Sequence, residues 1–138
     1  TLLGEMFPAD PMGIAQLIEP MGLTVGATVP TREWRELYGA LDGVAVAALH
    51  PFYTASIKEF QEAGKPIIGS APVGVEGVQS WLQSLGDALG LAPDLTQSAR
   101  NRALEMMRDV VRHQPIRGRI TPASGICSAR SRSCSLTG

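Results

Sequence analysis

The chain has 138 residues, of which 44% are hydrophobic and 18% charged, with 13 acidic against 12 basic side chains. This length and composition fit one folded domain and exclude an intrinsically disordered chain. The net charge of -1 gives no signal for binding to nucleic acid or to an anionic membrane, and no apolar run approaches the ~20 residues of a membrane span. We therefore expect a soluble, cytoplasmic protein.

Short apolar runs alternate with helical periodicity in the first third of the chain. The run from Thr1 to Met6 predicts a strand, and Asp10-Pro11 predicts a helix start, with Asp as the N-cap and proline at the first position. Gly22 is the expected C-cap of this helix. A second strand is expected over residues 23–29 and a second helix over 31–41. The inward face of that helix is predicted to consist of Trp34, Leu37, Tyr38 and Leu41.

The same alternation continues through the middle of the chain. A third strand is predicted over residues 44–49, and it is apolar throughout, as in a strand covered on both faces. A helix that ends at Gly64 follows, with Ile57 and Phe60 facing inward. A fourth strand is expected over residues 66–70.

Two further helices are predicted after the fourth strand. The inward face of the first consists of Val75, Val78, Leu82, Leu85 and Leu89, and Gly86 is a weak point in it. Trp81, like Trp34, is interpreted as a packing residue on a helical core face. The second helix, Thr96 to His113, is the longest, and its predicted buried residues are Ala99, Ala103, Met106, Met107 and Val110.

Strands of about five residues that alternate with helices of about ten to fifteen are typical of βαβ units. The predicted fold is therefore α/β, a doubly wound parallel sheet of about four strands with flanking helices. This domain is expected to span residues 1–115. Residues 116–138 lose all periodicity and form an irregular tail rich in Ser and Arg. Because the chain starts inside a predicted strand, we expect a piece of a longer protein.

Ligands of open α/β sheets bind beyond the carboxyl ends of the strands. The first strand ends there in Glu5, Met6 and Phe7, and the third in His50, Phe52 and Tyr53. His50 is a candidate general acid or metal ligand, or it only hydrogen-bonds a neighbouring backbone carbonyl. Glu5 is a candidate proton donor or a solvated carboxylate. The two aromatic rings either stack on a flat ligand or fill the sheet-to-helix junction.

Other kinds of site have weak support in the sequence. The segment Gly69 to Gly77 contains glycines, but neither the G-x-G-x-x-G spacing nor a G-K-[ST] ending, which disfavours a mononucleotide site. No G-x-S-x-G elbow is present. Cys127 and Cys134 both fall in the tail and have no further Cys or His nearby, so we predict no metal site there and no disulfide scaffold.

Four strings carry a resemblance to a known family: GEMFP, REWRELY, HPFYTA and GSAPVG. Together, over Thr1 to about Thr121, they resemble the Y-subunit family of chlorophyllide a reductase, the nitrogenase-like complex of bacteriochlorophyll synthesis. More remotely, the layout is similar to one Rossmann-like domain of the nitrogenase molybdenum–iron protein subunits. The resemblance therefore implies one domain of a nitrogenase component 1-like subunit.

The resemblance implies an oxidoreductase that performs the ATP-dependent reduction of the C7=C8 double bond of chlorophyllide a. Electrons would come from a partner iron–sulfur reductase component, which uses the ATP, through a [4Fe–4S] cluster at the interface with a Z-type subunit. The cluster ligands of the family match no position in residues 1–121, so no metal ligand is carried over, and the fragment alone is expected to be inactive. Chlorophyllide a is the implied substrate.

Within that family the carboxyl ends of the strands would line part of the chlorin pocket. His50 and Tyr53 are the expected polar anchors, with Met6, Phe7 and Phe52 as walls, and His50 or Glu5 as the candidate proton donor. Two alternatives stay open. One is a non-catalytic assembly domain whose aromatic residues contact a partner subunit, and the other is a nucleotide-binding domain that uses Gly69 to Gly77.

The tail departs from the family pattern. In the family an RGRIT segment begins the strand of the next domain, whereas here it is followed by PASGICSARSRSCSLTG, which has no strand or helix pattern. We expect a frameshifted or truncated product that ends just after one domain.

Overall fold

The structure, a computed structural model, describes residues 1–4 and 10–113. Its elements in chain order are β1 (Leu2–Leu3), α1 (Pro11–Ile18), the 3-10 helix η1 (Glu19–Met21), β2 (Thr28–Val29), the 3-10 helix η2 (Trp34–Leu41), β3 (Val46–Ala48), α2 (Thr54–Glu62), β4 (Ile67–Gly69), α3 (Gly74–Leu89) and α4 (Pro93–His113). Each predicted strand is present but shorter than expected. The predicted tail, residues 116–138, lies outside the described residues.

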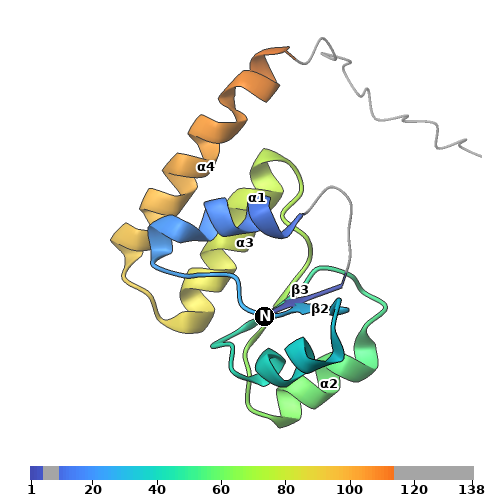
Figure 1. The fold of residues 1–138 in the computed structure, drawn as a ribbon. Coiled ribbons are helices and arrows are strands. Elements are labelled where there is room, and N and C mark those ends of the chain that lie inside the picture. Colours follow the sequence, from blue (N-terminus) through green and yellow to red (C-terminus); the bar gives the residue numbers. More distant parts are fainter. Residues whose placement is uncertain (5–9, 114–138) are drawn as a thin grey trace, which may run out of the picture.

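The four strands form one parallel sheet in the order β2-β1-β3-β4. Leu3 pairs with Val29 on one side and with Ala48 on the other, and Ala48 pairs with Gly69. These four residues form one row at the carboxyl edge of the sheet. Helices α1, α3 and α4 lie on one face of the sheet, and α2 and η2 lie on the other (Figure 1). The predicted α/β parallel fold is confirmed.

The first helical segment, α1 followed by η1, begins after Asp10 and ends at Gly22, as predicted. The carboxylate of Asp10 accepts a hydrogen bond from the backbone N–H of Gly13 at 2.8 Å, and Pro11 occupies the first turn, where its missing N–H costs nothing. The chain then continues as η1, whose C-cap is Gly22 at φ +72°. Glycine adopts this left-handed conformation without a steric penalty.

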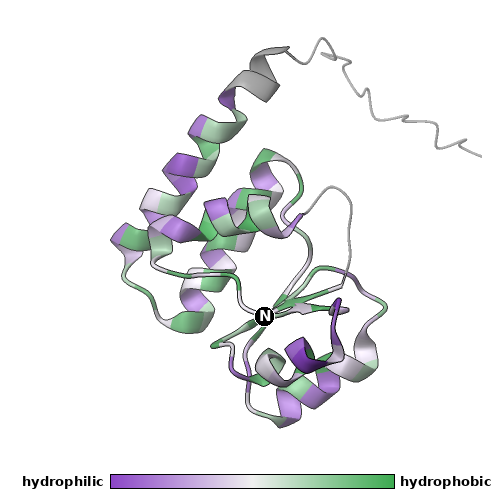
Figure 2. Ribbon diagram, viewed as in Figure 1, coloured by the Kyte–Doolittle hydropathy of each residue, from purple (hydrophilic) through white to green (hydrophobic). Residues whose placement is uncertain are grey.

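The hydrophobic core has two layers, one on each face of the sheet. Leu2 belongs to the layer beneath α1, α3 and α4, whereas its neighbour Leu3 belongs to the layer beneath α2 and η2. Side chains of consecutive strand residues point to opposite faces, so a buried strand must be apolar at every position. Figure 2 shows this hydrophobic band through the strands. Trp81 is buried in the first layer, as predicted.

Helices α3 and α4 approach closely where Gly86 meets Thr96. A Cβ atom on Gly86 would collide with the side chain of Thr96, which is itself buried. Ala99 and Ala103 continue this small-residue face of α4 and are fully buried. Gly86, which we interpret from the sequence as a weak point of the helix, therefore allows α4 to pack closely against α3.

The prediction that Met106 is buried is wrong, because its side chain is 36% exposed. The C-terminal half of α4 extends past α1 and α3 (Figure 1), so there are fewer neighbours to cover that side of the helix. Met107 packs against the core as predicted. The side chain of Val110 lies outside the described residues.

The prediction of an inward face on residues 31–41 is also wrong. The segment forms the 3-10 helix η2, which has three residues per turn, so a spacing of i, i+3, i+4 and i+7 no longer makes one face. Only Ala40 in η2 is buried. More than half of each predicted packing side chain is exposed: Trp34, Leu37, Tyr38 and Leu41.

No helix in the described part of the chain is long and apolar enough to cross a membrane.

Replacing Gly86 by Ala is expected to lower the free energy of unfolding by about 1–3 kcal/mol, because the added methyl group overpacks the contact with Thr96. The matched control is Gly77→Ala in the same helix, where an added Cβ meets nothing within 4 Å. This control should raise stability by about 0.5–1 kcal/mol through helix propensity. Urea denaturation of both variants measures the difference, and equal effects would contradict the close α3–α4 contact.

Candidate functional site

The carboxyl edge of the sheet contains a topological switch point between β1 and β3. The chain passes from β1 to β2 on one side and then to β3 on the other side of β1. In open α/β sheets the crevice at such a point is the usual place for a ligand. His50 follows the last residue of β3 by two positions, so the fold places it at this point.

The three residues predicted after the third strand form one aromatic cluster. The backbone N–H of Phe52 donates a hydrogen bond to Nδ1 of His50 at 3.3 Å, and the two ring centroids lie 4.7 Å apart. The ring of Tyr53 lies edge-on to the imidazole, with centroids 6.2 Å apart. Because Nδ1 accepts, the neutral imidazole of His50 carries its hydrogen on Nε2, which leaves that group as a donor.

The three side chains differ in burial, which separates their roles. Tyr53 is half-buried and packs against the core layer beneath α2. Phe52 is 85% exposed, whereas His50 is half-buried like Tyr53. Tyr53 therefore fills part of the sheet-to-helix junction, whereas the ring of Phe52 stays open to a ligand or partner.

Gly4, the residue after β1, brings the first strand against this cluster. Its φ is +102°, and a Cβ atom built on it would lie 2.8 Å from Cβ of His50 and 3.3 Å from Cε2 of Tyr53. Such approaches are shorter than real side chains allow, so only glycine fits here. No pattern in the sequence indicates this contact, because the two segments are far apart along the chain.

A pocket of about 460 Å³ opens beside His50 between β3 and β4. Its size falls within the range of small-molecule sites. Its lining residues are Ala48, Leu49, His50, Pro51, Ile57, Ile67, Gly69, Ser70, Ala71 and Val73. The sequence placed His50 here but missed Ile57 and Ile67, because the pocket forms only when α2 and the β4–α3 turn pack around the strand ends.

Ser70, on the pocket wall, has a φ of +67°, and it is the only residue other than glycine with positive φ among the described residues. Left-handed backbone in a residue other than Gly costs roughly 1 kcal/mol and is concentrated at functional sites. Ser70 lies in the Gly69–Gly77 segment, which the alternative nucleotide-binding function would use. The part of that segment lining the pocket presents small and apolar side chains.

A second cleft, of about 400 Å³, lies at the opposite, amino edge of the sheet, with Thr1, Ala45 and Trp81 in its wall. The buried Nε1 of Trp81 has no hydrogen-bond partner among the described residues. This edge carries neither the aromatic cluster nor the switch-point crevice, so we place the candidate site at the carboxyl edge.

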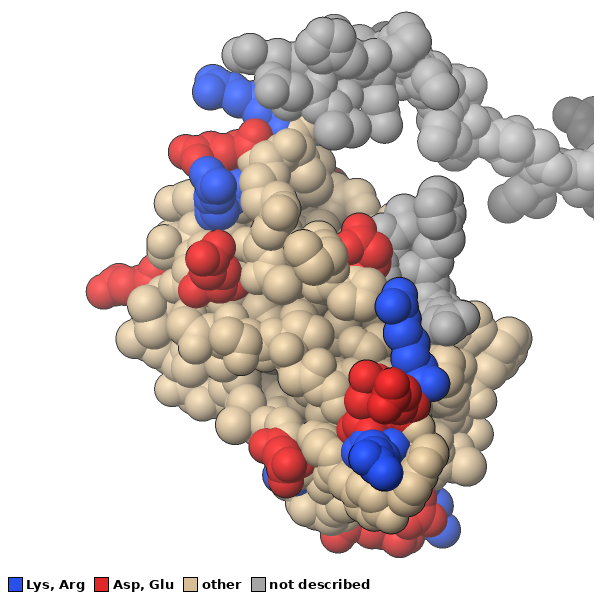
Figure 3. Space-filling view, viewed as in Figure 1, with Lys and Arg blue, Asp and Glu red and all other residues tan. Residues whose placement is uncertain are grey.

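The part of the chain that the structure describes contains no cluster of metal-binding side chains. No three or more His, Cys, Asp or Glu side chains gather there in a way that could hold a metal ion. Both cysteines, Cys127 and Cys134, lie outside it, as do Glu5, Met6 and Phe7. The residues that the structure describes therefore do not fit the ligand set of an iron–sulfur cluster. Figure 3 shows charges of both signs scattered over the visible face, without one basic or acidic patch.

Comparison with known proteins gives one family match and several similar proteins. A sequence model of the family described as nitrogenase component 1 type oxidoreductase matches residues 1–121. The chain is 55% identical over 121 residues to the chlorophyllide reductase 52.5 kDa chain of Rhodobacter capsulatus and 55% identical over 120 residues to that of Cereibacter sphaeroides. The alignments cover 88% and 87% of this chain but 24% of each relative. The chain thus spans about a quarter of the length of these relatives.

A more distant similarity is to light-independent protochlorophyllide reductase subunit N of Prochlorococcus marinus. It is 26% identical over 91 residues, which are 65% of this chain and 22% of that protein. No solved structure matches the chain significantly.

Replacing Gly4 by Ala is expected to lower the free energy of unfolding by at least about 2 kcal/mol, since it adds backbone strain and a clash with His50. Gly22→Ala is the matched control, because φ is +72° there but nothing lies within 4 Å of an added Cβ. It should show the strain alone, about 1 kcal/mol. If both substitutions cost the same in chemical denaturation, Gly4 is not in contact with the His50 cluster.

Proposed function

Because the chain belongs to the nitrogenase component 1 type oxidoreductases, we propose that it forms one α/β domain of the catalytic component of chlorophyllide a reductase. The reaction of the complete enzyme is the ATP-dependent reduction of the C7=C8 double bond of chlorophyllide a in bacteriochlorophyll biosynthesis. Two relatives that are 55% identical carry the name chlorophyllide reductase, which supports this proposal. Since the chain spans a quarter of their length, the activity is assigned to the complex, and this chain alone is inactive.

The observation that carries the proposal is an exposed aromatic ring that lies against a half-buried imidazole at an interplanar angle of 54°, beside an apolar pocket. Phe52 and His50 make this arrangement at the switch point of the sheet. A flat, conjugated and largely apolar macrocycle binds mainly by burial and stacking, with a few polar anchors. The carboxyl edge offers both kinds of contact.

Each predicted site residue has a role in this proposal. Phe52 forms a wall against the ring, and His50 and Tyr53 are the polar anchors. The Nε2–H of His50 is positioned to donate a hydrogen bond, and it is a proton donor if it reaches within about 3 Å of the reduced bond. Glu5 remains the alternative donor, and Met6 and Phe7 further walls. These three lie outside the described residues.

Electron supply is assigned to other parts of the complex. In the proposed enzyme a [4Fe–4S] cluster at the interface with a Z-type subunit delivers electrons, and a partner iron–sulfur reductase component uses the ATP. The described residues offer no ligand set for such a cluster, so no electron-transfer step is routed through them. We place the complex in the cytoplasm.

A non-catalytic assembly domain is the second candidate, and η2 favours it. Trp34 and Tyr38 lie on this 3-10 helix, 68% and 72% exposed, with their ring centroids 5.5 Å apart. Exposed aromatic side chains of this kind are typical anchors of protein interfaces. In this reading the domain contacts another part of the subunit or complex and does not touch the chlorin.

Absorbance titration of chlorophyllide a against the 138-residue chain separates the two functions. Phe52→Ala is expected to weaken binding about tenfold, because one stacked ring contributes roughly 1.4 kcal/mol. It should change the free energy of unfolding by less than about 0.5 kcal/mol, since the ring is exposed.

Trp34→Ala is the matched control, an exposed aromatic residue on η2 rather than at the carboxyl edge. Its affinity should equal that of the wild type. The absence of any spectral shift with the wild-type chain would favour the assembly function, and equal losses in both variants would indicate unspecific adsorption of the chlorin.

A further inference from the structure

The carboxyl edge of the sheet has an apolar pocket at one end and an exposed arginine at the other. The row Val29, Leu3, Ala48 and Gly69 marks where the four strands end. At the β4 end, the pocket beside His50 has no Lys or Arg in its lining. At the β2 end, Arg32 follows Val29 by three residues, and its side chain is exposed.

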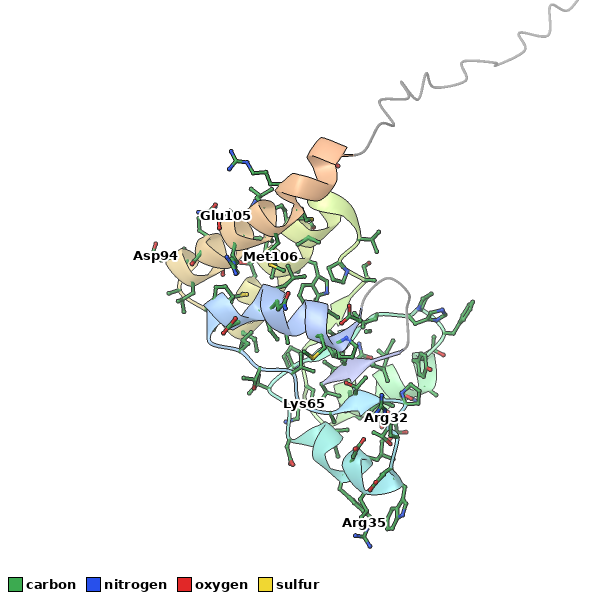
Figure 4. All side chains as sticks on the ribbon, turned by 45° about the horizontal axis from the view of Figure 1, so that its top comes forward. Arg32, Arg35, Lys65, Asp94, Glu105 and Met106 are labelled. Carbon is green, nitrogen blue, oxygen red and sulfur yellow. The ribbon has the colours of Figure 1, made fainter. Side chains whose placement is uncertain are left out.

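Arg32 is available for a ligand as far as the structure describes its neighbours. Within residues 1–4 and 10–113 the ion pairs join Lys58 to Glu62 and Arg102 to Glu105, and neither involves Arg32. The second arginine of the same segment, Arg35, lies within η2. Figure 4 shows Arg32 near the end of β2, whereas Arg35 projects from the outer side of η2.

The distance across the edge suits a four-ring macrocycle. Neighbouring strands are about 4.8 Å apart, so the line from β2 to β4 crosses three spacings, roughly 14 Å. A flat ligand that lies along this line passes over the switch point between β1 and β3. It then has one side against the apolar pocket and the other near Arg32.

The difference between the two ends of the edge determines at which end the carboxylate of such a ligand lies. A carboxylate placed in the apolar pocket would lose its hydration without a cationic partner, which is strongly unfavourable. A guanidinium binds a carboxylate through two parallel N–H···O bonds, so the acid group is best placed at the β2 end.

On the basis of the proposed function, we propose that Arg32 binds the free carboxylate of a tetrapyrrole acid whose apolar ring edge lies against the β3–β4 pocket. Arg32 is thus a residue that determines specificity for the acid over its esters. It takes no part in the reduction itself.

The test uses two probes that differ only in the acid group: pheophorbide a, a chlorin with one free carboxylate, and its methyl ester. Fluorescence titration of the full 138-residue chain gives both dissociation constants. The wild-type chain should bind the acid about fivefold more tightly than the ester, the upper end for an exposed ion pair. Arg32→Gln should bring this ratio to about one without changing the affinity for the ester.

Arg35→Gln is the matched control, with the same change of charge in the same segment, and it should keep the fivefold ratio. If the wild-type chain binds acid and ester equally, or if Arg35→Gln removes the preference as Arg32→Gln does, Arg32 is not the anchor, although binding of the ring still supports the proposed function. If neither probe binds the wild-type chain, both proposals fail. A normal urea transition for each variant rules out misfolding as the cause.

Discussion

The parallel pairing of β1 with β3 is the constraint on which the rest of the structure depends. The backbone N–H of Ala47 donates to the carbonyl of Thr1 at 2.9 Å, and that of Leu49 donates to the carbonyl of Leu3 at 2.8 Å. These bonds join segments more than forty residues apart. They bring Gly4 against His50, and they create the switch point at which the aromatic cluster stands.

The same pairing explains why the sheet needs cover on both faces. Leu2 and Leu3 point to opposite core layers. Loss of either group of helices, α1 with α3 and α4 or α2 with η2, would therefore expose one face of the strands. The two layers differ in how well they are covered. The contact of Gly86 with Thr96 closes the first layer, whereas η2 covers the second mainly through Ala40 and leaves its large side chains outside.

The exposed aromatic side chains on η2 and at the candidate site share one physical feature: each contacts one neighbouring ring and is otherwise open to solvent. The ring of Phe52 lies against His50 and is otherwise exposed, and the rings of Trp34 and Tyr38 contact each other edge-on and are also mostly exposed. Large apolar patches on a surface are typical of binding or assembly faces. Such faces support the proposed function, in which this domain contacts other parts of a larger subunit.

The sequence by itself determined the features that depend on local physics or on period. Asp10, Pro11 and Gly22 predicted the ends of the first helical segment, because capping and left-handed backbone depend on neighbouring residues only. Alternating short strands and helices predicted the α/β sheet. The strings around Glu5, His50 and Ser70 predicted a nitrogenase component 1-like protein, and membership of that family is confirmed. His50 could be placed at a strand end, because parallel strands end at one edge.

Only the tertiary structure decided which groups meet across that edge. In the folded chain the segment around Trp34 is a 3-10 helix with exposed side chains, because no described segment covers them. Gly86, which the sequence predicts to weaken its helix, contacts Thr96 in the folded chain. Packing also places Gly4, Ile57 and Val73 around His50. These outcomes depend on distances between segments far apart in the chain, and no periodicity in the sequence records such distances.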